Sequence, residues 1–324
     1  MSAIYEEADS DFDVPEPIKV LIALFDGMDV MDAIGPLEAF SHALHQKGKK
    51  ETAAFRTIFA SDDEYTNTTQ GATLRAHMTY DEAMKRLSEI DVLVIPGGSG
   101  NEAVIKGKKQ PLPLIKAFAE LQQKNPARER SLMSVCTGSH ILGEAGILSG
   151  LCATTHPDHY TKLEIICSNA AQRDLADRTD VMEERYIVNN LRFELGENPD
   201  ENPYLMSKHQ LKEQRRRRSS TAGPIPPIEE HPNGGGPMGG RRPSAARKGS
   251  ISLKQSNMRR ESVLKRANLR LGGLRVLTTG GVTSGIDGAL YLIGALVSDD
   301  AAEEAARVMC HKWVKGVVVD GTDV

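Results

Sequence analysis

One cysteine, Cys136, lies where a buried strand is predicted to turn into a helix. The apolar run at residues 132–135 is typical of a buried strand, and the apolar residues at 141–145 recur at helical spacing. Ser134 and Gly138 flank the cysteine at the positions where a nucleophile elbow requires small residues. The dipole of the new helix would lower the thiol pKa below its free value of roughly 8.5. Taken alone, this stretch is equally compatible with a small, unreactive buried cysteine.

Other candidate residues are predicted at the same edge of a parallel sheet, where ligands bind outside the carboxyl ends of the strands. Asp32 precedes a helix whose first turn would contain Pro36, so we expect its side chain just outside that helix. A solvent-facing helix cap is the alternative for this aspartate. The remaining candidates follow strands or lie in loops on that side: Gly98, His156, Gly280 and Gly281. Their convergence, more than any one of them, predicts a reactive site.

The glycine turn at residues 97–100 is predicted to serve chemistry through its backbone. Residues 98–103 match the G-x-G-x-x-A phosphate fingerprint, but Pro96 precedes them and the motif belongs after the first strand of a nucleotide-binding unit. We therefore reject a nucleotide site and expect no cofactor. A glycine turn can instead bring a free N–H group, here that of Gly98, close to a reacting oxygen.

Strands that alternate with helices predict an α/β fold with a mostly parallel sheet covered on both faces. The runs expected to form strands are residues 18–25, 55–60, 91–95, 132–135, 181–188 and 274–278. Besides the helix after Cys136, the stretches expected to form helices are residues 33–44, 80–87, 114–123, 159–166, 289–297 and 301–313. Thr79 is the predicted cap of the helix at 80–87.

The composition, with 40% hydrophobic and 26% charged residues in 324, allows one large core or two small ones, and the organisation of the chain favours one. The cysteines other than Cys136 are Cys152, Cys167 and Cys310, and all four are too far apart for C-x-x-C spacing. We expect no metal site and three inert thiols. No apolar signal segment and no run of about 18 apolar residues is present, which predicts a soluble protein in a reducing, cytoplasmic compartment.

Two segments differ from the rest of the chain. Residues 1–16 are acidic, and residues 196–273 contain Pro-Pro and Gly-Gly-Gly stretches. We predict that both are disordered, because they cannot bury enough apolar surface to offset their loss of chain entropy. Residues 212–270 carry 15 basic and 4 acidic residues, whereas the whole chain has a net charge of −4. Residues 17–195 and 274–324 are then predicted to form one domain that carries the basic segment as an insertion.

In their order along the chain, several stretches resemble the DJ-1/PfpI superfamily (class I glutamine amidotransferase-like), and in particular its isonitrile hydratase branch. The resemblance rests on Asp29-Val30-Met31-Asp32-Ala33-Ile34-Gly35-Pro36, Pro96-Gly97-Gly98-Ser99-Gly100, Ser134-Val135-Cys136-Thr137-Gly138, Ala153-Thr154-Thr155-His156 and residues 278–287. It implies a flavodoxin-like three-layer sandwich and a homodimer. It also implies that Cys136 is the nucleophile on an elbow, Asp32 its acidic partner and His156 a further catalytic residue.

The reaction that the resemblance implies is hydration of a small electrophile, an isonitrile, to an N-formamide. An ionised carboxylate would raise the pKa of a neighbouring thiol, so the pair is favourable only if Asp32 holds a proton that it can donate. The backbone N–H groups of Gly98 and Thr137 would stabilise developing negative charge. Candidates for the wall of the substrate pocket are Gly97, Gly280 and Gly281.

Other interpretations stay open. Glyoxalase or deglycase chemistry through a hemithioacetal at Cys136 is the second enzymatic possibility. A redox sensor or regulatory protein whose Cys136 oxidises reversibly is the non-catalytic one. His156 is also compatible with a hydrogen-bonded structural role, and we expect packing or surface roles for His140 and His159.

The basic insertion carries serines that follow arginine or lysine at the spacing of basophilic kinase sites: Ser219, Ser244, Ser250 and Ser262. Phosphorylation there would change the local charge strongly. The same charge fits a nuclear-import signal or weak nucleic-acid contact, and it fits equally a solvated loop without a partner. We predict a basophilic kinase as the candidate partner of this segment, and we do not expect nucleic acid or a membrane as a partner.

Overall fold

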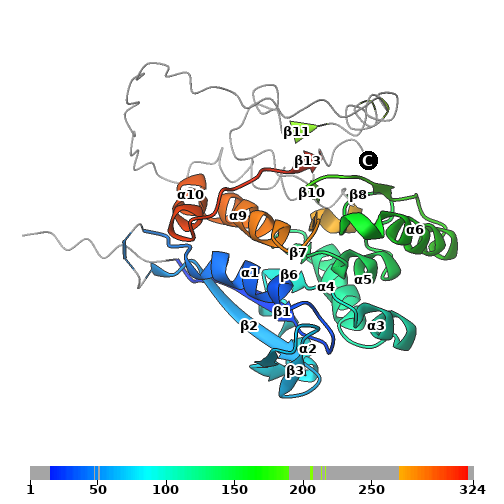
Figure 1. The fold of residues 1–324 in the computed structure, drawn as a ribbon, viewed down its shortest axis with the longest axis horizontal. Coiled ribbons are helices and arrows are strands. Elements are labelled where there is room, and N and C mark those ends of the chain that lie inside the picture. Colours follow the sequence, from blue (N-terminus) through cyan, green and yellow to red (C-terminus); the bar gives the residue numbers. More distant parts are fainter. Residues whose placement is uncertain are drawn as a thin grey trace, which may run out of the picture.

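A mostly parallel sheet runs through the molecule, flanked by helices (Figure 1). The computed structural model describes residues 15–46, 48–49, 52–189, 205–206, 213, 216 and 270–319. Within these residues, the main sheet has nine strands in the order β11-β13-β10-β12-β7-β6-β1-β2-β5. Their bounds are β1 Ile18–Ala23, β2 Phe55–Ser61, β5 Met78–Thr79, β6 Val92–Ile95, β7 Ser131–Ser134, β10 Tyr186–Asn189, β11 Leu205–Met206, β12 Arg275–Thr279 and β13 Val317–Val319.

Two small sheets stand beside the main one. They pair β3 (Tyr65–Asn67) with β4 (Thr73–Arg75), and β8 (Cys152–Ala153) with β9 (Asp180–Val181). The run predicted as one strand at residues 181–188 is therefore wrong, because its ends belong to β9 and β10 in different sheets. The other predicted strands are confirmed as β1, β2, β6, β7 and β12, with bounds that differ by one or two residues.

The helices form two groups. Figure 1 shows α10 (Asp299–Val308) beside α9 (Ser284–Leu296) and α1 (Val30–Ser41) below α9, and α9 contacts both of the others. The other group is α3 (Asn101–Gly107), α4 (Leu112–Lys124), α5 (Gly138–Glu144) and α6 (Tyr160–Asp174). The short α2 spans Tyr80–Lys85, and 3-10 turns occupy η2 Leu87–Glu89, η3 Pro157–His159 and η5 Arg270–Gly273.

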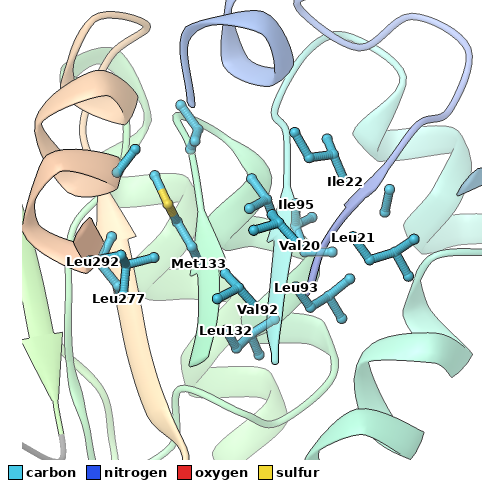
Figure 2. Packing of buried hydrophobic residues seen from close by; sticks show 14 of the residues in the cluster. Val20, Leu21, Ile22, Val92, Leu93, Ile95, Leu132, Met133, Leu277 and Leu292 are labelled. Atoms are coloured by element: carbon cyan, nitrogen blue, oxygen red, sulfur yellow. The ribbon is translucent and has the colours of Figure 1, made fainter. Parts of the chain in front are cut away.

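The central strands are buried on both faces, as expected for continuous apolar runs in a parallel sheet. Every residue of β6 and β7 is buried. Figure 2 shows Leu93, Leu132 and Met133 packed side by side with neighbours from β1 and β12. This packing fixes the strands, and with them the loops that follow their carboxyl ends.

Four parallel strands deliver their carboxyl ends to the same edge of the sheet. β1 pairs with β6, β6 with β7, and β7 with β12, each in parallel register. The segments that follow these strands contain Asp32, Gly98, Cys136, Gly280 and Gly281, whereas His156 follows β8 of a small sheet. β10 is different, because it runs antiparallel to β12 with Asn189 opposite Val276.

The start of α1 differs from the prediction. Asp29 is the N-cap, and its side chain accepts a hydrogen bond of 3.1 Å from the backbone N–H of Met31. Asp32 therefore lies in the first turn and not outside the helix, and Pro36 lies in the helix interior. The sequence offers aspartates at both positions, and only the packing selects the first as the cap.

Two other helix ends can be compared with the sequence. Thr79 caps α2 in a capping box with Glu82, which confirms the predicted cap. The last predicted helix reaches only Val308, and the chain continues past Trp313 into β13. No helix in the described part of the chain is both long and apolar enough to cross a membrane.

The predicted acidic tail and basic insertion fall mainly outside the described residues. Within residues 196–273, the structure describes the strand β11, which pairs in parallel with β13, positions 213 and 216, and the turn η5. The candidate phosphorylation sites Ser219, Ser244, Ser250 and Ser262 all lie outside the described ranges.

Candidate active site

Cys136 lies on a sharp turn between β7 and α5. Its backbone φ is +55°, in the left-handed region that residues with a side chain rarely adopt. Gly138 is required two residues later, because a methyl group there would overlap the backbone carbonyl oxygens of Ile95 and Pro96. The strand, the strained turn and the small flanking residue are the features expected of a nucleophile elbow.

The Asp32 carboxyl is fully buried and hydrogen-bonded on one side only. Its Oδ2 accepts a hydrogen bond of 2.9 Å from the backbone N–H of Gly97, whereas its Oδ1 is buried without a partner. The predicted alternative of a solvent-facing cap is therefore wrong. An unpartnered oxygen in a buried carboxyl favours the protonated form, because the charged form loses its hydration.

Gly97 brings the aspartate and the cysteine turn together. A methyl group at Gly97 would lie 2.6 Å from the Thr137 nitrogen and 2.9 Å from Asp32 Oδ2. Such distances are shorter than real contacts, so no larger residue fits without displacing one of the two groups. Gly97, which was predicted to line the pocket, therefore lies packed between Asp32 and Thr137 behind the site.

The N–H group of Gly98 is not free for an oxyanion. It donates a hydrogen bond of 3.0 Å to the Thr137 hydroxyl. Asn101 holds the same residue, since its side-chain amide donates to the Thr137 carbonyl oxygen at 2.7 Å and to the hydroxyl at 2.9 Å. The prediction that Gly98 offers a free N–H donor is therefore wrong in this structure. The Thr137 backbone instead acts on the Cys136 sulfur and lowers its pKa.

The pKa of Cys136 differs from the value expected from the dipole of α5 alone, and the pKa of Asp32 is shifted as well. Burial raises the pKa of the Cys136 thiol to about 12, and the neighbouring Asp32 charge contributes to the rise. Burial likewise raises the pKa of the Asp32 carboxyl to about 7. The predicted lowering by the helix dipole is outweighed, because α5 has only seven residues while the sulfur has lost most of its water. Near neutral pH the pair therefore holds at least one proton, and Cys136 is a thiol that would have to give its proton away before it could act as a nucleophile.

A cavity of about 550 Å³ opens over the cysteine. Four predicted site residues line it: Gly98, Cys136, Thr137 and His156. Its other lining residues are Asp29, Thr69, Ser99, Asn101, Glu102, His140, His159, Lys162 and Val282. Asp32, Gly97, Gly280 and Gly281 are not on its wall. Asp32 and Gly97 lie behind the cysteine turn, while a methyl group at Gly281 would lie 3.5 Å from His156 Cδ2.

His156 stands at the rim of the cavity with a fixed ring. Its Nδ1 accepts a hydrogen bond of 3.2 Å from the backbone N–H of Asp158, so the proton of the neutral ring is on Nε2. The preceding Thr155 donates its hydroxyl proton to the Cys136 carbonyl oxygen at 3.1 Å. The Thr-Thr-His turn is therefore tied directly to the cysteine turn.

Two further histidines belong to the same wall, contrary to the expectation that they only pack or face solvent. The rings of His156 and His159 have centroids 5.7 Å apart, and those of His159 and His140 are 5.4 Å apart. His140 follows Cys136 by four residues and lies in the first turn of α5, which begins two residues after the cysteine. That spacing was the signal available in the sequence. Within the described ranges, no group of three or more His, Cys, Asp or Glu residues is arranged to hold a metal ion.

The comparisons with known proteins point to one family. Residues 18–190 match the model of the DJ-1/PfpI family. An uncharacterized protein from the cpoL 5' region of Streptomyces lividans is 32% identical over 152 residues, which cover 47% of this chain and 96% of that protein. The isonitrile hydratase of Pseudomonas putida is 42% identical over 67 residues, which are 21% of this chain and 26% of the enzyme.

Solved structures agree on the fold. A ThiJ/PfpI family protein from Pseudomonas syringae aligns with a TM-score of 0.50 and 16% identity over 97% of this chain and 84% of its own. Schizosaccharomyces pombe DJ-1 aligns with a TM-score of 0.50 and 12% identity over 91% of this chain and 100% of its own. At these identities the likeness supports the flavodoxin-like α/β architecture and nothing finer.

Proposed function

The chain belongs to the DJ-1/PfpI family, and on that premise we propose that it is an enzyme that attacks a small electrophile with Cys136, most specifically an isonitrile. The observation that carries the proposal is the cysteine at φ +55° on the wall of a cavity, with a buried, proton-holding aspartate behind it. Partial similarity to an isonitrile hydratase supports the choice of substrate.

The Cys136 thiol and the Asp32 carboxyl suit isonitrile hydration, because each step of the reaction requires proton transfer. The sulfur of Cys136 bonds to the terminal isonitrile carbon, and the thiol proton passes through the Asp32 carboxyl to that carbon. The product is a thioimidate. Water then adds to the same carbon, the C–S bond breaks, and the sulfur recovers a proton as the N-formamide leaves. The Asp32 carboxyl gives the proton that it holds to the carbon and takes the thiol proton in its place, for which a pKa of about 7 is well placed.

The test is turnover of cyclohexyl isocyanide to N-cyclohexylformamide, followed by chromatography. We expect Cys136→Ser to abolish turnover and Asp32→Asn to lower kcat by roughly 10²- to 10⁴-fold, because the proton carrier is lost. Cys310→Ser is the matched control, since this exposed thiol lies outside the cavity and its loss should leave kcat unchanged. Wild-type activity that survives Cys136→Ser would contradict the proposal.

A second candidate is glyoxalase-type conversion of methylglyoxal to lactate. The observation that favours it is the row of three imidazoles at the cavity, because this reaction must carry a proton from one carbon of the hemithioacetal to the next. The same variants tested with methylglyoxal distinguish the two activities. If neither compound is turned over while mild peroxide forms a sulfenic acid at Cys136, the sensor function replaces both; the raised thiol pKa disfavours that outcome.

The remaining proposals concern assembly and regulation. We expect a cytoplasmic homodimer, in keeping with the family resemblance. A basophilic kinase acting on the serines of residues 196–273 stays a prediction, and so does the single domain formed by residues 17–195 and 274–324.

A further inference from the structure

The ring of His140 has one nitrogen occupied and one without a partner. His140 is 2% exposed and lines the cavity over Cys136. Its ring makes a hydrogen bond with the His159 backbone that raises its pKa, whereas Nε2 is buried with no partner. The occupied nitrogen is therefore Nδ1, which donates its proton to the backbone carbonyl, and Nε2 presents a lone pair.

The ring stays neutral at physiological pH. Burial, together with the charges of His159 and Lys162, lowers the pKa of His140 to about 4. His140 is thus a hydrogen-bond acceptor and not a cation. A buried acceptor without a partner has lost its hydration and gained nothing in return, so a bound molecule with a donor would recover that loss.

Asn101 offers a second acceptor on the same wall. Its side-chain nitrogen donates twice to Thr137, which fixes the orientation of the amide. Its Oδ1 is buried without a partner. The two buried atoms without a partner, His140 Nε2 and Asn101 Oδ1, are therefore both hydrogen-bond acceptors. The nearby Lys162 ammonium group is already paired, because its Nζ lies 2.6 Å from Glu102 Oε1.

We propose that the Cys136 cavity selects electrophiles that carry a hydroxyl or N–H group close to the reacting carbon, and that His140, assisted by Asn101, binds this donor. The proposal deepens the proposed function and rests on one part of it, namely that the sulfur of Cys136 is the reacting atom. A site that hydrogen-bonds a donor rejects the analogue without it more strongly than an apolar pocket rejects a change in size. A plain alkyl isonitrile would then be a poor substrate beside one with a hydroxyl or amide group.

The test uses alkylation of cysteine, which does not require turnover. The full-length protein is treated with iodoacetamide, which has N–H donors, or with methyl iodoacetate, which has none. The rate at each cysteine is measured by peptide mass spectrometry. The exposed Cys310 is the internal reference for the intrinsic reactivity of the two reagents. We expect the rate ratio of amide to ester at Cys136 to exceed the ratio at Cys310 by roughly 10- to 100-fold.

Two variants assign this preference to the ring. His140→Leu removes the acceptor and should bring the Cys136 ratio at least about fivefold closer to that of Cys310. His140→Gln keeps an acceptor oxygen and should retain most of the preference. Equal ratios at the two cysteines of the wild type would overturn the proposal even if the Leu variant fails to fold, and so would a Leu variant that keeps the full preference. Absence of isonitrile turnover together with a preserved preference would instead overturn the proposed function alone.

Discussion

At the residue scale, the burial that prepares Asp32 for proton transfer also lowers folding stability. An aspartate in the unfolded chain ionises near pH 4, whereas burial raises the pKa of folded Asp32 to about 7. Between these values the folded state binds more protons than the unfolded state, so stability falls as pH rises. At pH 8 the buried charge costs up to about 4 kcal/mol, taking about 1.36 kcal/mol for each unit of pKa.

We predict that Asp32→Asn stabilises the protein at pH 8 by about 2–4 kcal/mol while it removes most activity. The gain should shrink toward zero as the pH is lowered to 4, because the wild-type carboxyl then becomes neutral as well. Urea unfolding at a series of pH values measures this. Asp63→Asn is the control, since Asp63 is exposed. Stability curves of the wild type and of Asp32→Asn that run parallel from pH 4 to 8 would contradict the buried charge.

The sequence pointed to this pair and to a proton on Asp32, but it did not predict the raised pKa of the Cys136 thiol. Cys136 was found because the apolar period changes at that residue, which is a local property of the chain. Its pKa depends on the balance between burial and the dipole of α5, and burial is set by residues far away in sequence. For the same reason His140 was assigned a packing or surface role, although it follows Cys136 by only four residues and lines the same cavity.

At the scale of elements, α9 is anchored by a buried carboxylate. Asp287 is fully buried, and its Oδ2 lies 2.6 Å from Arg185 Nε. Its Oδ1 accepts from His311 Nε2 at 2.8 Å and from the Val314 backbone N–H at 3.0 Å. One side chain thereby links the first turn of α9, the loop before β10 and the segment that leads into β13.

We expect Asp287→Ala to lower the free energy of unfolding by about 3 kcal/mol, because the cation of Arg185 would lose its buried partner and Val314 its acceptor. Equilibrium denaturation in urea measures the loss. The matched control is Glu120→Ala, whose ion pair with Lys124 is exposed and should contribute less than about 1 kcal/mol. Equal effects of the two substitutions would show that the Asp287 network is not a fold anchor.

At the scale of the whole molecule, the sequence was most informative where a strand is buried on both faces. The five central strands were found because continuous apolar runs have few other uses in an α/β protein. Strands of two or three residues such as β5, β8 and β13 were missed, because so few residues show neither an apolar run nor an alternation. The cavity was predicted only in part: four of its lining residues were named, but its wall also combines residues from separate loops, and no local sequence pattern shows that these meet.

We predict that replacing residues 196–268 by a short Gly/Ser linker shifts the thermal midpoint by less than about 3 °C, because shortening a loop changes its closure entropy only logarithmically. In the described part of the chain, the main buried core draws only on residues 18–188 and 271–318. The linker variant would lack β11, a two-residue strand at the edge of the main sheet. A variant with a scrambled segment of equal length is the control, and loss of a cooperative transition would contradict the single-domain assignment.

The antiparallel pairing of β10 and β12 has a practical consequence for protein engineering. Asn189 and Val276 face each other across the ladder, and opposite residues in such a pair are about 5 Å apart. The two strand ends therefore suit the insertion of a foreign folded domain whose termini lie close together, such as a fluorescent reporter. A reporter grafted there would lie at the amino end of β12, beside the start of β7 and at the opposite edge of the sheet from the cysteine turn, so it would mark the protein in living cells without covering the cavity.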